Sequence, residues 1–368
     1  TPGVSWQYVV ATIVMLFLGW TMLTITHLAW GGELTDDYHE RSRVTASREA
    51  AYIVGMITVL LLPIIVQQYG GDKFAQVASM GWYVILTLPI GVAVAVLTLK
   101  ERDVPPVEHL SWSAALGAIA SNKPLRYILF CDLIAGISGG IVATLFLPMV
   151  AHGLGLPQHS YVLLLVYFAM GVVAIPPMLW LSKRLGKHRM MVAHVLANAV
   201  MIPCIFLIPN GDLTAAVVLW TLLGLNMSVG PFLFRAIMAD VADHDQAETG
   251  HARAGLYFAM LALTNKLGYS GAIVVAGFAL SYIGFAGKAV NPPDVISSLM
   301  LIYIVPPTII SILIGIVMWR FPLDEARQRE LRRIIEERAA PGTAIGARVG
   351  HAIEDEVDLP APQPKPAE

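Results

Sequence analysis

The chain is poor in charged residues, and this scarcity limits the kinds of protein it can be. Only 14% of its 368 residues are Asp, Glu, Lys or Arg, whereas 56% are hydrophobic, and the mean hydropathy is +0.66. A soluble domain carries about 25% charged residues to cover its surface. The composition therefore excludes a soluble globular protein, and the net charge of −2 gives no sign of nucleic-acid binding.

Cysteine is also scarce, and a familiar metalloprotease motif is missing. The two cysteines, Cys131 and Cys204, lie inside apolar runs and have no metal-ligand spacing. They are predicted to be small buried hydrophobic residues and not a disulfide or redox pair. There is no His-Glu-Xaa-Xaa-His motif, and the histidines are expected on loops and helix ends. No catalytic residue and no metal ligand is predicted, which disfavours an integral-membrane enzyme.

What the sequence has instead is about nine long apolar runs. A bilayer core of about 30 Å needs about 20 apolar residues per helix. Several runs contain proline, which membrane helices tolerate because neighbouring helices satisfy the backbone. We therefore predict an all-α polytopic membrane protein with transmembrane helices at about Ser5–Trp30, Ala50–Tyr69, Ala75–Leu99, Leu125–His152, Tyr161–Leu181, Met191–Pro209, Thr214–Met238, Gly255–Phe285 and Val295–Trp319.

Lys and Arg alternate between the connections, which predicts the orientation. The fifth connection contains Lys183, Arg184, Lys187 and Arg189, whereas the fourth, Gly153–Ser160, contains neither residue type. Because basic residues accumulate in cytoplasmic loops, odd-numbered connections and the C-terminus are predicted to be cytoplasmic. The first residue then lies outside. No initiator Met and no signal peptide precedes the first run, so we expect an N-terminally truncated chain.

The longest cytoplasmic connection separates three runs from six. Two six-helix halves joined by such a loop are typical of the major-facilitator fold, so we predict this fold with about three N-terminal helices missing. The predicted divisions are a three-helix remnant of the N-terminal half (residues 1–99), a central cytoplasmic loop (100–124), a six-helix C-terminal half (125–320), and a cytoplasmic helix with a disordered tail (321–368).

Three segments carry more specific information than hydropathy. They are HLAWGGELTDDYHERSRVTASREA (His27–Ala50), WLSKRLGKHRM (Trp180–Met190) and ADVADHDQAETGHARAGLYFAMLALTNKLG (Ala239–Gly268). Together they resemble the glycoside–pentoside–hexuronide:cation symporter family, the melibiose permease-like group of the major facilitator superfamily. The segments occur in the family's order, and the resemblance extends to about Glu337. It implies cation-coupled symport of a sugar or glycoside by alternating access.

Lys266 is the first candidate site residue. It lies about a dozen residues into the eighth run, which is about 18 Å at 1.5 Å per residue and hence near the bilayer midplane. A cation there costs at least about 2.5–3.5 kcal/mol unless it faces water or a carboxylate. Lys266 is either a cavity-facing group or part of a structural ion pair. The resemblance, in which the family's Lys-Leu-Gly lysine matches Lys266, favours a role in binding substrate or in cation coupling.

Four further substrate-binding candidates lie in and after the first run. By position alone, Trp30 is an interfacial anchor. The resemblance implies instead that Trp30 and Arg48 line the sugar cavity, where an indole stacks on a sugar ring and a guanidinium binds paired hydroxyls. Thr26 and His27 lie one turn before Trp30. Thr26 stands where the family's sugar permeases can carry an aspartate, and that carboxylate is absent here.

Four residues are candidates for cation coupling or a gate. Asp132, about one and a half turns into the fourth run, either pairs with a basic residue at a cytoplasmic gate or contacts solute. Arg235, Asp240 and Asp243 lie at the cytoplasmic end of the seventh run. They are predicted to form a gate network, with a solvated loop that sets topology as the alternative.

The expected partners are a small solute, a sugar or glycoside, and the lipid bilayer of the plasma (inner) membrane, with no nucleic acid. No cofactor is expected apart from a coupling cation, Na+ or H+. The alternatives are symport of another amphipathic solute such as a lysophospholipid, and a non-transporting membrane scaffold. Since the family's cation-binding carboxylates lie chiefly on a helix before the first run, this chain by itself is expected not to catalyse coupled transport.

Overall fold

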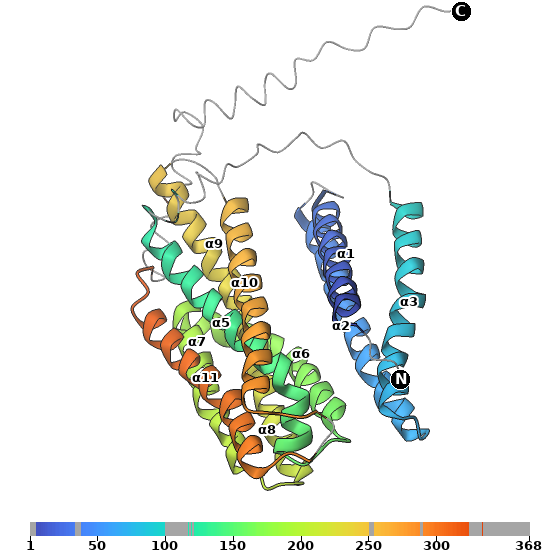
Figure 1. Ribbon diagram of the computed structural model, residues 1–368. Helices are drawn as coiled ribbons and strands as arrows, with labels where there is room; N and C mark the ends of the chain where they lie inside the picture. The colour runs from blue at the N-terminus through green and yellow to red at the C-terminus, as the bar shows by residue number, and fades with distance from the viewer. Residues whose placement is uncertain are drawn as a thin grey trace, which may run out of the picture. The chain divides into compact units, whose positions relative to one another are not determined.

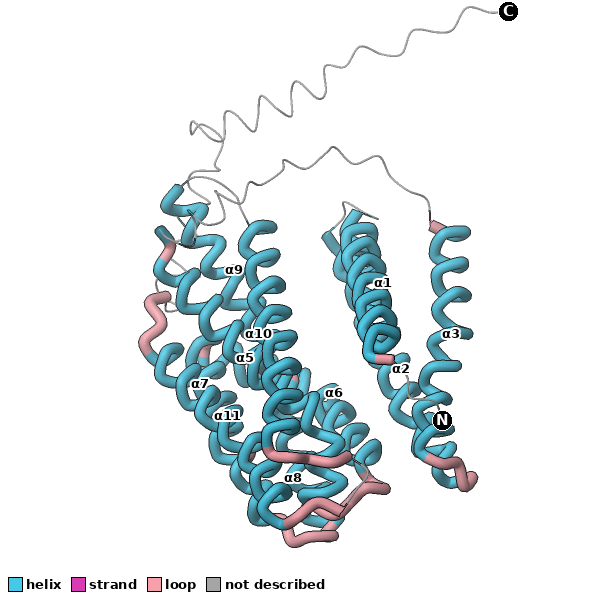
Figure 2. The backbone as a smooth tube through the Cα atoms, in the orientation of Figure 1, coloured by secondary structure: helices cyan, strands magenta, loops and turns pink. Residues whose placement is uncertain are grey.

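The computed structural model describes residues 5–33, 38–99, 121–249, 254–287 and 290–323, together with 117, 119 and 333. Within these residues the secondary structure is helical, without strands, and short loops join most of the helices (Figure 2). Nine helical spans in the described part of the chain are long and apolar enough to cross a membrane, which confirms the predicted fold class. Most of the predicted central loop, the cytoplasmic helix and the tail lie outside the described residues.

Contacts between Cα atoms divide the chain into two units, residues 1–109 and 110–368. The first unit contains α1 (Trp6–Glu33), α2 (Tyr38–Gln68) and α3 (Lys73–Thr98). α2 and α3 form a hairpin, in which the carboxylate of Asp72 accepts the Ala75 N–H at 2.8 Å and caps α3. Most large apolar side chains of α1 and α3 are exposed within this unit, as expected where the surrounding medium is lipid.

The second unit is a bundle of seven described helices (Figure 1). α5 continues into a π-helical segment, Met149–Gly153, and α7 is followed by a 3₁₀ segment, Pro203–Leu207. The helices are α5 (Lys123–Pro148), α6 (Ser160–Leu185), α7 (Lys187–Met201), α8 (Leu213–Met227), α9 (Val229–Thr249), α10 (Ala254–Tyr282) and α11 (Pro293–Trp319).

α8 and α9 together make one membrane span that is broken in its middle. The span covers Leu213–Thr249, and Ser228 is the single residue between the two helices. Pro231 follows three residues later and has no N–H to give to the carbonyl of Met227. The interruption is therefore encoded locally, although the apolar pattern predicts one continuous helix there.

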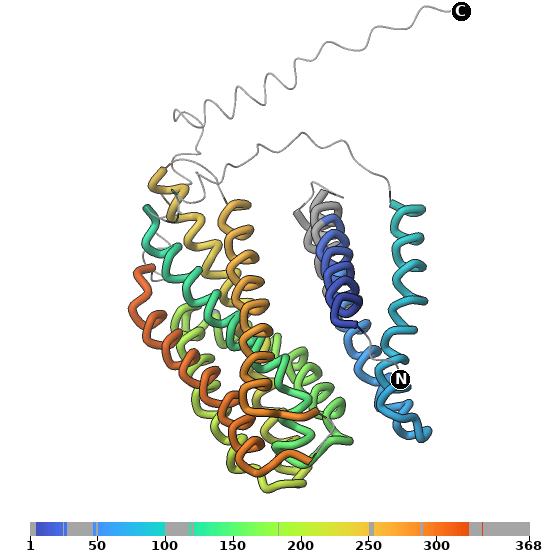
Figure 3. Tube along the Cα trace, viewed as in Figure 1, coloured from blue at the N-terminus to red at the C-terminus, as the bar shows by residue number. Residues whose placement is uncertain are grey.

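α5 and α10 lie side by side although more than 100 residues separate them in sequence (Figure 3). Their backbones approach closely because glycines stand at the contact. A Cβ added to Gly136 would lie 2.6 Å from the carbonyl oxygen of Asn265, and one added to Gly268 would collide with the carbonyl oxygen of Leu133. Small residues are the usual means by which membrane helices pack this tightly, so these glycines fix the α5–α10 pair.

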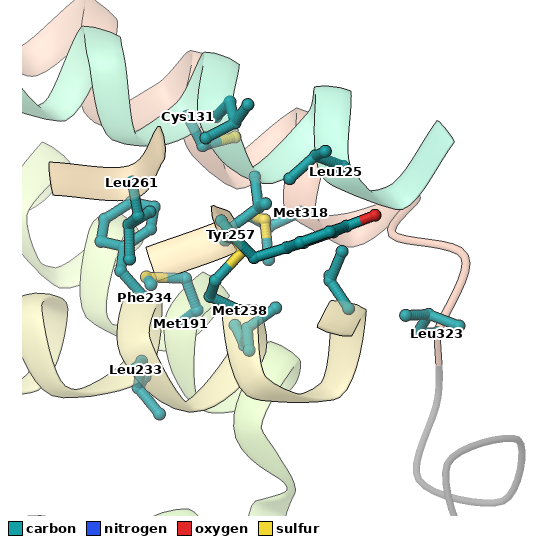
Figure 4. Packing of buried hydrophobic residues seen from close by; sticks show 14 of the residues in the cluster. Leu125, Cys131, Met191, Leu233, Phe234, Met238, Tyr257, Leu261, Met318 and Leu323 are labelled. Atoms are coloured by element: carbon teal, nitrogen blue, oxygen red, sulfur yellow. The ribbon is translucent and has the colours of Figure 1, made fainter. Parts of the chain in front are cut away.

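A hydrophobic cluster fills the end of the bundle at which α5 begins. Tyr257 of α10 is fully buried at its centre (Figure 4), and the hydroxyl of Tyr257 accepts a hydrogen bond from Asn122 Nδ2 at 3.3 Å. Asn122 also caps α5 by accepting the Leu125 N–H at 2.9 Å. The labelled residues come from α5, α7, α9, α10, α11 and the segment that follows α11: Leu125, Cys131, Met191, Leu233, Phe234, Met238, Leu261, Met318 and Leu323.

The tight α5–α10 contact predicts opposite effects for two substitutions on α10. Gly268→Ala places a methyl group against the Leu133 carbonyl, and overpacking of this kind costs about 1–3 kcal/mol. Gly271→Ala, in open space one turn further on, should be neutral or stabilising by up to about 1 kcal/mol through helix propensity. Thermal unfolding of the purified protein in detergent measures both. Equal midpoints for the two variants would contradict the assigned role of Gly268.

Candidate functional site

Asp132 lies inside the membrane span at the α5–α10 contact. It is the tenth residue of α5, about 13–14 Å along the axis from Lys123, and its exposed fraction is 3%. It is deeper than one and a half turns because α5 begins before the first apolar residue. Its Oδ2 accepts a hydrogen bond from the Thr264 hydroxyl at 2.8 Å, and its Oδ1 accepts one from Asn265 Nδ2 at 3.2 Å. Both donors are neutral side chains of α10.

Lys266 follows these two donors directly in sequence. It is the thirteenth residue of α10, about 18 Å along the helix, so the predicted depth within the helix is confirmed. Its side chain is exposed within the second unit. Thr264, Asn265 and Lys266 thus form a polar segment inside a helix that is otherwise apolar enough to span a membrane. Polar residues at such a depth are costly and mark functional pathways.

A second polar contact joins the start of α7 to α9. Lys187 Nζ lies 2.6 Å from Asp240 Oδ1 and also donates to the Ala236 carbonyl at 3.2 Å. Gly186, between α6 and α7, has φ 82° and ψ 153°, a conformation that essentially only glycine adopts. This turn starts α7 at Lys187, so that its side chain reaches α9.

Of the three gate residues predicted on α9, Asp240 has a described ion pair, and its partner lies on α7. Asp240, with a side chain 10% exposed, contacts Lys187, to which the sequence assigned only a topological role. Asp243 is partly buried one turn further on, and Arg235 is exposed. The pairing was missed because Lys187 and Asp240 are 53 residues apart, although the basic turn and the Ala-Asp-Xaa-Xaa-Asp segment were both recognised.

A buried polar cluster joins α7 and α8 and was also missed. His194 Nδ1 lies 3.1 Å from Asn226 Oδ1, and Asn226 Nδ2 donates to Asn198 Oδ1 at 2.9 Å and to the His194 carbonyl at 3.0 Å. The expectation that histidines lie on loops and helix ends is wrong for His194, which is buried inside α7. The four-residue spacing of His194 and Asn198 within an apolar run was the available signal.

A cavity of about 280 Å³ lies beside the break between α8 and α9. Its lining is mostly apolar, with residues of α6 such as Met178 facing residues of α9 such as Phe232. Two serines, Ser182 and Ser228, also line it, and the Ser228 hydroxyl is buried without a hydrogen-bond partner. The cavity could therefore accommodate a small apolar group that carries one polar atom.

The substrate-binding candidates of α1 and α2 belong to the first unit. Thr26 and His27 are exposed, and the Thr26 hydroxyl donates to the Met22 carbonyl of its own helix at 2.8 Å. Trp30 is in α1, one turn after Thr26, but its side chain lies outside the described residues. Arg48 of α2 is partly exposed. Their assigned roles stay predictions.

A sequence motif known from hydrolases lies inside a helix of this protein. Gly136–Gly140 reads Gly-Xaa-Ser-Xaa-Gly, the motif of a hydrolase nucleophile, but that chemistry requires a sharp turn between a strand and a helix. Here the motif lies inside α5, with Gly136 and Gly140 against α10. Among the described residues, no group of three or more His, Cys, Asp or Glu side chains could hold a metal ion.

Comparison with known proteins identifies transporters. The model of the family described as MFS/sugar transport protein matches residues 2–325. A protein of Escherichia coli K12 named as a glycoside/cation symporter, YagG, is 24% identical over 94% of this chain and 77% of its own length. A glucuronide carrier protein homologue from the same organism is 22% identical over 90% of this chain and 73% of its own. The human sodium-dependent lysophosphatidylcholine symporter 1 is 18% identical over 66% and 46%, respectively.

The ion pair between Lys187 and Asp240 predicts the outcome of a charge exchange. Lys187→Asp and Asp240→Lys each place like charges together, and each should lower the unfolding midpoint in detergent. The double variant restores opposite charges, so we expect a coupling energy of about 0.5–3 kcal/mol. Lys123→Asp, at an exposed position where α5 begins, is the control and should be neutral. Strictly additive losses in the double variant would show that the contact contributes nothing.

Proposed function

Because the chain belongs to the MFS/sugar transport protein family, we propose that it carries out cation-coupled symport of a sugar or glycoside by alternating access. It is a multi-pass membrane protein of a transporter family, and its partner is a small-molecule solute. In this proposal it resides in the inner membrane. Its C-terminus lies in the cytoplasm, because the odd-numbered connections together contain more Lys and Arg than the even-numbered ones.

The observation that carries the proposal is the polar segment Thr264–Lys266 within α10. A lysine deep in a span is retained at considerable cost unless it faces water or polar groups. Here it follows two side chains that hold the buried carboxylate of Asp132. A scaffold has no need of such groups, whereas a transporter needs a polar site near the midplane of the bilayer. Lys266 donates to solute hydroxyls in this proposal.

The remaining candidates are given roles by their chemistry. Trp30 offers an aromatic face to a sugar ring, and Arg48 offers a planar fork of donors to paired hydroxyls. Thr26 and His27 add short-range polar contacts. On the cytoplasmic side, the Lys187–Asp240 contact holds α7 against α9. Arg235 and Asp243 extend this group of charges along α9, and the group rearranges when the cavity opens inward.

Uptake of radiolabelled solutes tests the proposal directly. The complete gene product, reconstituted into liposomes, is offered a panel of glycosides, pentosides, glucuronides and a lysophospholipid, with and without a sodium gradient or a pH gradient. We expect accumulation of at least one glycoside when a cation gradient is imposed. Accumulation of a lysophospholipid, with none of any sugar, would replace the sugar assignment with the amphipathic-solute alternative suggested by the human relative.

Substitution of Lys266 separates transport from a scaffold role. Loss of a charge-assisted hydrogen bond costs about 1.5–3 kcal/mol, which equals a factor of about 10 to 150 in apparent affinity. We expect Lys266→Ala to reduce the initial rate of uptake at low solute concentration by this factor at normal expression, and Lys266→Arg to reduce it less. Lys123→Ala, an exposed lysine where α5 begins, is the matched control. Uptake unaffected by Lys266→Ala would remove this residue from the site.

A further inference from the structure

The carboxylate of Asp132 lies where a negative charge is energetically unfavourable. Its exposed fraction is 3%, it lies inside a span, and its two hydrogen-bond donors in the described structure, Thr264 and Asn265, are neutral. The α5–α10 interface next to it is closely packed, since Gly136 of α5 and Gly268 of α10 bring the backbones together. An ionised carboxylate in such a place is strongly disfavoured unless a proton or a cation neutralises it.

The donor set favours a proton over a metal cation. A hard cation takes several oxygen ligands, yet Asn265 presents its Nδ2–H group, a hydrogen-bond donor, to Asp132. The Thr264 hydroxyl already donates to the carboxylate. Thr264 and Asn265 each donate to one oxygen of Asp132. This arrangement suits a carboxyl group that alternates between an ionised state, which accepts hydrogen bonds, and a protonated state, which donates one.

We propose that Asp132 binds and releases a coupling proton in this symporter, in addition to the cation-binding carboxylates that the family resemblance places on a helix before α1. The inference rests on the proposed function and adds the identity of the coupling ion and its site. One proton from the aqueous phase on one side forms an O–H bond at Asp132 Oδ2. The same bond breaks when the proton leaves to the other side, so one proton crosses in each cycle and the carboxylate is regenerated.

The hydroxyl of Thr264 is placed to serve both states. With Asp132 ionised, it donates to Oδ2 at 2.8 Å. The backbone carbonyls of Met260 and Leu261 lie 3.1 and 3.0 Å from the same hydroxyl oxygen. When Oδ2 carries the proton, Oδ2 donates to the Thr264 oxygen, and the hydroxyl hydrogen rotates to one of these carbonyls. Every polar group stays hydrogen-bonded, and no helix has to move.

Protonation at Asp132 is also placed to influence the solute site. Thr264 and Asn265 are the residues immediately before Lys266 on α10. Protonation removes one negative charge from the group that these two side chains hold. The electrostatic environment of Lys266, which binds solute in the proposed function, therefore changes with the occupancy of Asp132, and this links proton binding to solute binding.

Other titratable groups on the neighbouring elements have to be distinguished from Asp132. Cys131 is adjacent on α5 and buried, and Asp240 contacts Lys187. The charged or titratable side chains described on the elements packed against α5 are Tyr257, Lys266, Tyr269 and Tyr282 on α10, Arg235, Asp240, Asp243, His244, Asp245 and Glu248 on α9, Asp294 and Tyr303 on α11, and His152 in the π-helical segment. A pH response that persists without the Asp132 carboxyl would originate in one of these groups.

The test compares gradient-driven accumulation with exchange in the reconstituted complete gene product. A gradient of one pH unit corresponds to a factor of about ten in concentration for each coupled proton. We therefore expect about tenfold accumulation of a transported glycoside, and a fall of about tenfold in the ratio of accumulation to counterflow in Asp132→Asn. Asp212→Asn makes the same chemical change at a helix cap that asparagine serves equally well, and should leave the ratio unchanged.

An infrared measurement on the purified protein tests whether Asp132 becomes protonated, and it does not depend on transport. Difference spectra between acidic and neutral pH should contain a carboxylic C=O band that disappears in Asp132→Asn and shifts in Thr264→Val. If Asp132→Asn does not fold, Asp132→Glu and Thr264→Val replace it, with a shifted band in each and a lower ratio in Thr264→Val.

Three results would overturn the proposal: an unchanged ratio in Asp132→Asn, accumulation driven by sodium but not by a pH gradient, or the absence of an Asp132-dependent band. If no glycoside is transported under any gradient, the proposed function fails. In that case the infrared band alone shows whether Asp132 binds a proton.

Discussion

Inside a bilayer every backbone N–H and C=O must find a partner within the protein, because no water is available to take its place. The nine membrane-spanning segments described satisfy this requirement as helices. The helices therefore differ from one another at only a few places. At these places the regular helical hydrogen bonding is interrupted, two backbones come unusually close, or polar side chains lie inside the span. These places are the α8–α9 break, the glycine contacts of α5 and α10, and the polar groups that join α5 to α10, α7 to α8 and α7 to α9.

Those polar groups share an arrangement. Asp132 with Thr264 and Asn265, and His194 with Asn226 and Asn198, each join two helices through hydrogen bonds between side chains. A polar group that faces lipid would cost several kcal/mol, whereas one that pairs across a helix interface both avoids that cost and fixes the rotation of the two helices. The same groups that could bind ions or solute therefore also determine how the helices pack.

The sequence predicted the spans well and the pairings poorly, for one physical reason. Length and hydropathy are properties of a single helix, so the nine runs were recognisable. Two limits were wrong, since α2 begins at Tyr38 and not at Ala50, and α9 ends at Thr249 and not at Met238. Which residue meets which depends on the rotation of each helix about its axis, and nearly uniform apolar helices contain little of that information. Lys187 and Asp240 were thus noticed in separate motifs and not as a pair, and the partners of Asp132 went unnoticed. The break at Ser228 was missed because the apolar pattern continues through it, although Pro231 marks it.

The interruption between α8 and α9 has a mechanical consequence. At most points along a transmembrane helix, bending breaks a backbone hydrogen bond. At this point Pro231 supplies no N–H to the carbonyl of Met227, so a change of angle there sacrifices no bond that the straight helix would have had. α8 is anchored to α7 through Asn226, whereas α9 is tied to the first residue of α7 through Asp240. The two parts of the span can therefore change their angle at Ser228, while each part stays attached to α7 on its own side of the break.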